Sequence, residues 1–148
     1  MKKTMNYITL EVLSRSSNEA FARTAVACFA AQMDPTLGEL EDIKTAVSEA
    51  VTNAIVHGYP NVLGKVLVKA KICEGNVLEV SVKDRGRGIP DVEKARQPMF
   101  TTGGEERSGM GFTIMESFMD HIAVKSVPGK GTTVTLRKKL APRRRQTA

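Results

Sequence analysis

Hydrophobic and polar residues alternate in several segments of the chain, which is the pattern of strands that bury one face. In residues 6–13, Ile8, Leu10 and Val12 alternate with residues that suit an exposed face. The same period of two recurs at residues 65–72, 77–83, 122–127 and 132–139. Glycine-containing turns at 74–76 and 128–131 join these later segments in pairs, so we expect two hairpins.

Hydrophobic residues recur at helical spacing in three other segments. The first predicted helix extends from about Asn18 to Gln32, after a serine at 16 or 17 that can cap it, and ends before Asp34-Pro35. Its apolar face is expected to contain Phe21, Ala25, Cys28 and Phe29. The third predicted helix starts near Ser108 and extends to about Asp120.

The second predicted helix is the longest and has signals at both ends. Thr36 can cap its start, with Glu39 placed for a capping box. Gly58 is expected to end it in a left-handed conformation, just before Pro60. Its apolar positions are Leu37, Leu40, Ile43, Val47, Ala50, Val51 and Ala54.

The order of these elements predicts an α/β (α+β) two-layer sandwich, in which three helices cover one face of a mixed, mostly antiparallel sheet. We expect one domain over residues 1–140 and a basic tail over 141–148. Residues 84–108 make a long connection for such a domain, and loops of this length often have a function.

Composition indicates a soluble, cytoplasmic protein. Hydrophobic residues make up 41% and charged residues 26% of the chain, which is ordinary for globular proteins. The apolar run Ala25–Ala31 is too short to span a membrane, and no apolar signal core follows Met1. Cys28 and Cys73 lack metal-ligand spacing, so we interpret both as reduced thiols in the core.

The formal net charge of +6 is concentrated near the C-terminus. Six of the 22 basic residues lie within 137–145, and the remaining 16 balance the 16 acidic residues. Aromatic residues make up only 5% and Trp is absent, which argues against a nucleic-acid-binding face. We prefer a solvated, disordered tail to a binding arm.

Glu49, Asn53 and His57 recur every four residues and therefore lie along one stripe of the second helix. The amide oxygen of Asn53 is a hard ligand that suits magnesium, an ion often bound to substrate phosphates as well. Glu49 can accept a proton from an attacking hydroxyl or water. Polarity of an exposed helix face explains the same residues, and a buried or capping role explains His57 better.

Asp84 is in phase with the apolar side chains of strand 77–83, so its carboxylate should point toward the helices. A buried carboxylate needs a hydrogen-bond donor. Gly86 and Gly88 follow, and glycine lets the backbone approach a flat ring. The exocyclic amine of adenine suits this arrangement, but taken alone these residues are better explained by an aspartate turn.

Gly109 and Gly111 lie at the expected start of the third helix, where backbone N–H groups attract phosphate. The segment matches neither the P-loop nor the dinucleotide-binding pattern, since Ile114 replaces the third glycine of the latter. A glycine loop before an amphipathic helix is the plainer alternative. Additional phosphate donors are available at Thr101, Thr102, Arg107 and Ser108.

In this order, the three segments resemble the N box and the two glycine boxes of the GHKL ATPase and kinase superfamily. They are Glu49…Asn53, Asp84-x-Gly86-x-Gly88 and Ser108-Gly109-x-Gly111, and Gly131-Thr132-Thr133 resembles the strand threonine near the adenine site of that superfamily. The anti-sigma serine kinases of spore-forming bacteria are similar over longer stretches, namely SEAVTNAIVHGY, DRGRGIPDVEKARQPMFTT and ERSGMGFTIMESFMD. This similarity extends from about Tyr7 to Lys139.

The resemblance implies ATP or ADP and Mg²⁺ as cofactors, and phosphorylation of a serine on an anti-anti-sigma factor. It also implies that the protein binds a sigma factor of the sigma-F type and keeps it from RNA polymerase. The family forms homodimers, for which strand 6–13 is a candidate edge, and Arg23 is a candidate partner contact. We expect no direct binding of nucleic acid or membrane.

By position, the resemblance makes Glu49 the catalytic base or orienting residue, and Asn53 the metal ligand at the cofactor. Adenine contacts are assigned to Asp84, Gly86, Gly88 and Thr133. Phosphate contacts are assigned to Thr101, Thr102, Arg107, Ser108, Gly109, Met110 and Gly111. Alternatives are a stress-response relative, a detached histidine kinase domain, for which the chain lacks a dimerisation hairpin, and a non-catalytic ATP-dependent module that sequesters a sigma factor.

Overall fold

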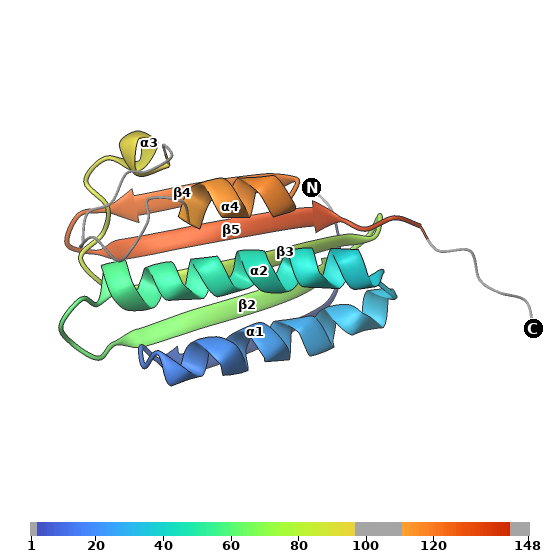
Figure 1. Ribbon diagram of the computed structural model, residues 1–148, viewed down its shortest axis with the longest axis horizontal. Helices are drawn as coiled ribbons and strands as arrows, with labels where there is room; N and C mark the ends of the chain where they lie inside the picture. The colour runs from blue at the N-terminus through green and yellow to red at the C-terminus, as the bar shows by residue number, and fades with distance from the viewer. Residues whose placement is uncertain (1–2, 97–110, 143–148) are drawn as a thin grey trace, which may run out of the picture.

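The computed structural model describes residues 3–96 and 111–142 (Figure 1). The strands are β1 (Thr4–Leu13), β2 (Lys65–Cys73), β3 (Val77–Asp84), β4 (His121–Val127) and β5 (Gly131–Lys139). The helices are α1 (Ser17–Ala30), α2 (Leu37–Asn53), α3 (Val92–Ala95) and α4 (Gly111–Phe118). A 3₁₀ turn, η1 (Ala31–Met33), follows α1, and a π-helical turn, η2 (Ala54–Gly58), follows α2. None of the described helices has the length and apolar character needed to cross a bilayer.

The strands form one sheet in the order β1-β2-β3-β5-β4, and each of these pairings is antiparallel. Helices α1, α2 and α4 all cover the same face of this sheet (Figure 1). The predicted two-layer sandwich, its strands and its two hairpins are therefore confirmed. Because β3 pairs with β5, the end of β3 lies beside the start of β5.

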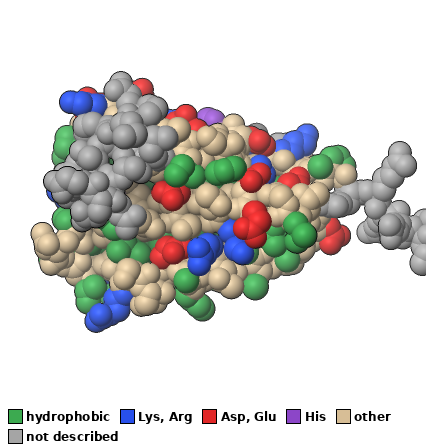
Figure 2. All heavy atoms as spheres, in the orientation of Figure 1, with side chains coloured by type: hydrophobic (Ala, Val, Ile, Leu, Met, Phe, Trp, Pro, Cys, Tyr) green, Lys and Arg blue, Asp and Glu red, His purple; other side chains and the backbone are tan. Residues whose placement is uncertain are grey.

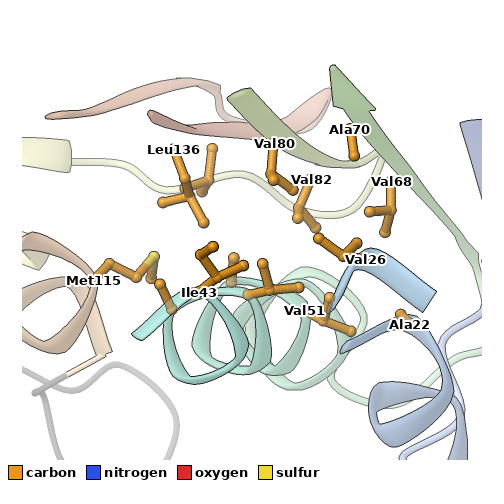
Figure 3. Packing of buried hydrophobic residues seen from close by; sticks show 14 of the residues in the cluster. Ala22, Val26, Ile43, Val51, Val68, Ala70, Val80, Val82, Met115 and Leu136 are labelled. Carbon is orange, nitrogen blue, oxygen red and sulfur yellow. The ribbon is translucent and has the colours of Figure 1, made fainter. Parts of the chain in front are cut away.

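Helix α2 lies in the middle of the helical layer and supplies the centre of the core. Ile43 and Val51 of α2 point toward the sheet, where Leu136 lies, and Val26 of α1 and Met115 of α4 flank them (Figure 3). Burial of each large aliphatic side chain contributes about 1.5–3 kcal/mol. The core therefore fixes the position of α2 relative to the sheet.

The predicted apolar face of α1 is right at Phe29, which is buried in the core, but wrong at two other positions. Phe21 is 57% exposed, and Cys28 is exposed as well, whereas Cys73 is buried as predicted. The buried residues of this helix are Ala22, Val26, Ala27, Phe29 and Ala30. Both stripes have helical spacing, but the small residues let α1 pack closely against α2 and the sheet.

The start of α2 is as predicted, but its end is not. Thr36 Oγ1 accepts from the Glu39 N–H at 2.9 Å, and Glu39 Oε1 accepts from the Thr36 N–H at 2.8 Å, which completes the capping box. Leu37 is 84% exposed and does not join the core. Gly58 is not left-handed. The helix widens into η2 instead, and Gly58 meets another segment of the chain there.

On the helix-covered surface, charged side chains of both signs are interspersed (Figure 2). Glu19 lies 3.6 Å from Arg23 on α1, and Glu41 lies 3.4 Å from Lys44 on α2. Such partly exposed pairs contribute little to stability. The Arg23 side chain is 35% exposed, so part of it is accessible at the surface of α1.

Candidate functional site

The end of α2, the end of β3 and the starts of β5 and α4 converge at one end of the sandwich (Figure 1). Asp84, the last residue of β3, is 3% exposed, which confirms the prediction that it points toward the helices. Its Oδ1 accepts a hydrogen bond from the Gly86 N–H at 2.9 Å. The strand thus ends with a buried acidic side chain held by its own loop.

The environment of Asp84 disfavours its charged form. Burial raises the pKa of the Asp84 carboxyl above its ordinary value, and backbone hydrogen bonds with Gly86 and Thr132 oppose part of this shift. A further N–H donor would stabilise the carboxylate, because hydrogen bonds to charged groups are the stronger ones. The site is therefore suited to a ligand that carries an amine or amide N–H.

Three glycines allow the backbone to cross closely around Asp84. A Cβ on Gly86 would lie 1.9 Å from the Gly58 carbonyl oxygen, and a Cβ on Gly131 would lie 2.1 Å from the Asp84 carbonyl oxygen. A Cβ on Gly58 would lie 2.7 Å from Asp84 Cγ. Real Cβ atoms do not approach so closely, so any larger residue would separate these segments.

Gly88 is needed for a second reason. Its φ is +76°, and a Cβ there would lie 2.4 Å from the Val127 carbonyl oxygen. Gly86 and Gly88 thus both face protein backbone in this structure. The sequence interpretation attributed their lack of a side chain to an approaching ring, and a contact between these residues and adenine stays a prediction.

The threonine beside Asp84 is Thr132, whereas sequence reasoning chose Thr133. Asp84 is paired with Thr132 across β3 and β5, and Thr132 is only 4% exposed. Thr133 is paired with the exposed Lys83, so both side chains lie on the uncovered face of the sheet. Alternation could have revealed this, because Thr132 is in phase with the buried residues Val134 and Leu136.

Glu49 and Asn53 lie on α2, one helical turn apart and half-buried. A Cβ on Gly111, at the start of α4, would lie 3.4 Å from Glu49 Oε1. The structure therefore brings the predicted base next to one of the predicted phosphate residues. Asn53 is the last residue of α2 and lies between Glu49 and the segment around Asp84 along the helix axis.

The loop after Asp84 is tied to η2 by hydrogen bonds that the sequence did not reveal. The Arg87 N–H donates to the Gly58 carbonyl at 3.1 Å, and Arg87 Nε donates to the His57 carbonyl at 3.0 Å. The Tyr59 hydroxyl accepts from the Arg85 N–H at 2.7 Å and donates to the Lys65 carbonyl at 2.8 Å. A π-helical turn often marks a functional site, and here it presents carbonyl groups to this loop.

The remaining predicted phosphate residues lie outside the described part of the chain. They are Thr101, Thr102, Arg107, Ser108, Gly109 and Met110. On either side of this gap, Arg96 and Glu116 form an ion pair at 3.0 Å, which links the chain after α3 to α4. Within the described residues, no group of three or more His, Cys, Asp or Glu side chains is placed to hold a metal ion.

Comparisons with known proteins agree with this arrangement. The model of a family described as the histidine kinase-like ATPase domain matches residues 14–138. A protein named anti-sigma F factor from Thermoanaerobacter pseudethanolicus (strain ATCC 33223 / 39E) is 59% identical over 134 residues, which cover 90% of this chain and 93% of the relative. An anti-sigma F factor from Geobacillus kaustophilus (strain HTA426) is 57% identical over 137 residues, which cover 92% of this chain and 94% of the relative.

A solved structure shares the fold. The crystal structure of the RsbU and RsbW domains of Rv1364c from Mycobacterium tuberculosis superposes with a TM-score of 0.66 and 22% sequence identity. The match covers 92% of this chain and 32% of that chain. At this identity the likeness shows a common architecture and nothing about activity.

Proposed function

Because the chain belongs to the histidine kinase-like ATPase domain family, and within it to the anti-sigma F factors, we propose that it is an ATP-dependent protein-serine kinase and an anti-sigma factor. Its proposed protein substrate is a serine of an anti-anti-sigma factor. Its proposed target is a sigma factor of the sigma-F type, which it would hold away from RNA polymerase in the cytoplasm.

One observation carries the proposal. A single packed helix, α2, presents Glu49 and Asn53 on one stripe and then ends, through η2, against the loop of the buried Asp84. Asp84 can accept from the adenine amine, while Glu49 faces Gly111, where the phosphates would lie at the start of α4. Helix α2 therefore sets the distance between Asp84, where the adenine would bind, and Gly111, where the phosphates would bind.

The residues present fit a magnesium nucleotide. Mg²⁺ commonly takes one or two protein ligands and completes its coordination with water and substrate phosphates. The amide oxygen of Asn53, a hard oxygen donor, suits the role of a single protein ligand. When bound, the ion would neutralise charge on the phosphates.

Glu49 is the proposed general base. Its carboxylate would accept the proton of the substrate serine as the serine oxygen forms a bond to the γ-phosphorus and the bond to the ADP oxygen breaks. Phosphoryl transfer needs mainly positioning and charge neutralisation. The packing of α2 supplies the positioning, because shifting Glu49 would disturb the core.

Partner binding and dimerisation are proposed on separate surfaces. Among the described strands, β1 lies at one edge of the sheet, so its outer side can pair with a second copy, and its residues Met5 and Tyr7 are exposed. The proposed partner contact is Arg23 of α1, whose side chain is partly exposed. A non-catalytic module that only sequesters a sigma factor is the second candidate function, and it predicts no phosphate transfer.

Replacing Glu49 with glutamine tests the kinase. We expect Glu49→Gln to bind ATP normally and to lose about 10²- to 10⁴-fold in phosphate transfer, since only the proton acceptor is removed. The measurement is mass-spectrometric detection of phosphoserine on the anti-anti-sigma factor after incubation with ATP and Mg²⁺. Glu41→Gln is the matched control, because Glu41 lies on the exposed side of the same helix.

Two results would contradict the proposal. Equal transfer rates for Glu49→Gln and the wild-type protein would remove Glu49 from the chemistry. Absence of phosphoserine with well-folded wild-type protein, together with retention of the sigma factor, would favour the non-catalytic module.

A further inference from the structure

Ser126 of β4 joins three separate parts of the backbone at the Asp84 end of the sheet. Its Oγ accepts from the Ile89 N–H at 2.7 Å and lies 3.1 Å from the Gly131 carbonyl oxygen, to which it can donate. It also lies 2.7 Å from Thr132 Oγ1. The family resemblance assigned no role to this residue.

The chemistry of a hydroxyl decides how these contacts are shared. Serine has one proton to donate and two lone pairs that accept. If Ser126 donates to the Gly131 carbonyl, it can accept both the Ile89 N–H and the Thr132 hydroxyl proton. This arrangement satisfies all three contacts. In it, Thr132 has used its only proton and offers only lone pairs to the site.

Thr132 lies directly opposite Asp84 on the helix-covered face of the sheet, and both residues are buried. Two neighbouring acceptors, a carboxylate and a hydroxyl oxygen, favour a ligand that presents N–H groups. The adenine 6-amine offers two N–H donors from one atom, one for each acceptor, whereas hypoxanthine carries a carbonyl oxygen at position 6 and its N–H at position 1. The direction of the Thr132 hydroxyl is therefore a means of distinguishing these bases.

Ser126 also anchors the loop that borders the site. Ile89 follows Gly88, and the Arg87 carbonyl accepts from the Gly129 N–H at 2.7 Å. The loop after Asp84 is thus attached to β4 at Ser126 and to the turn between β4 and β5 at Gly129. Without Ser126, the Ile89 N–H would lose its partner and the Thr132 hydroxyl would be free to rotate.

We propose that Ser126 is a positioning residue for nucleotide-base recognition, which orients the Thr132 hydroxyl as an acceptor and holds the loop at Ile89. The proposal rests on the proposed nucleotide-binding function. Ser126 acts through Thr132, so substitutions at the two positions should not have independent effects.

The test compares ATP with inosine triphosphate, which has a carbonyl in place of the 6-amine, by titration calorimetry with Mg²⁺. We expect Ser126→Ala to weaken ATP binding about tenfold and to reduce the ATP-to-ITP preference by a similar factor. Ser126→Thr keeps the hydroxyl and should restore both. Ser117→Ala is the control, because Ser117 is an exposed α4 residue that donates to the Thr113 carbonyl at 2.9 Å.

A double substitution separates positioning from general loosening of the fold. If Ser126 acts through Thr132, Ser126→Ala combined with Thr132→Val should have little more effect on the ATP-to-ITP preference than Thr132→Val alone. Additive effects, or an unchanged preference in Ser126→Ala, would overturn the proposal. If Ser126→Ala does not fold, the ATP-to-ITP preference of Thr132→Val is the test instead. A preference equal to that of the wild-type protein would overturn the proposal.

The result for the wild-type protein distinguishes this inference from the function on which it rests. If the folded wild-type protein binds neither nucleotide, the proposed function fails and the inference fails with it. If the wild-type protein prefers ATP and Ser126→Ala does so equally, only the inference fails.

Discussion

The two ends of β3 depend on turn residues for different physical reasons. At its start, Gly75 and Asn76 have positive φ values of 83° and 63°, which the tight turn from β2 requires. At its end, Gly86 has no such φ, but its missing side chain lets the backbone approach the Gly58 carbonyl. The need for a positive φ depends only on the turn itself. The need for a residue without a side chain at Gly86 arises because segments remote in sequence meet there.

The two ends also differ in what they hold. At the start of β3, Asn76 Nδ2 donates to the Leu140 carbonyl at 2.9 Å, and the Leu140 N–H donates to the Asn76 carbonyl at 2.9 Å. These bonds fasten the C-terminal strand. At the other end, the crossing surrounds a buried carboxylate that the proposed function uses. The comparison indicates that the turn at the start of β3 contributes to stability, whereas the loop at its end forms part of the proposed nucleotide site.

The largest expected effect on stability is at Gly86, where the loop after β3 crosses close to the Gly58 carbonyl. Gly86→Ala should destabilise the fold by about 3 kcal/mol or more, because the new methyl group overlaps the Gly58 carbonyl, and it should abolish ATP binding. Gly129→Ala is the control, since Gly129 has a φ of +80° but no atom within 4 Å of its Cβ position. That change should cost about 1 kcal/mol, as conformational strain alone does. If Gly86→Ala and Gly129→Ala lowered the free energy of unfolding in urea equally, the close contact at Gly86 would not matter more than the backbone conformation at Gly129.

Asp84→Asn should separate stability from binding. We expect ATP affinity to fall about 10- to 100-fold, because a charged acceptor is lost. A carboxyl whose pKa is raised by burial stabilises the fold at low pH, and this contribution is lost as pH rises through that pKa. Asp84→Asn should therefore be at least as stable as the wild-type protein at pH 7, and its relative stability should fall toward pH 4.

Urea unfolding between pH 4 and pH 7 and calorimetry with ATP measure the two effects of Asp84→Asn. A relative stability that rises as the pH falls would mean that the charged form of Asp84 is favoured in the fold. Unchanged ATP affinity would show that adenine does not bind to Asp84.

The smallest effect is expected at the start of β3. Asn76→Gly keeps the positive φ but removes the side-chain bond to Leu140, so it should cost about 1 kcal/mol in urea unfolding. Asn76→Ala should cost about 1 kcal/mol more, because alanine disfavours the left-handed conformation. ATP affinity should be unchanged in both variants. A loss comparable to that of Asp84→Asn would show that this end also shapes the site.

The sequence by itself determined the features that depend on neighbouring residues. Alternation located the strands, the Thr36 and Glu39 pair marked the start of α2, and phase along β3 indicated that Asp84 is buried. Each of these follows from backbone geometry within a few residues. The order of the segments that contain Glu49, Asp84 and Gly111 was sufficient to suggest the family.

Only the tertiary structure decided what depends on segments remote in sequence. It decided which of two apolar stripes on α1 is buried. It showed that Gly58 is not left-handed and instead allows close approach of the loop after Asp84. It also placed Thr132 rather than Thr133 beside Asp84. It also joined Ser126 to Thr132. The physical reason is that close packing and hydrogen-bond pairing are set by which surfaces meet, and local sequence does not specify the partner surface.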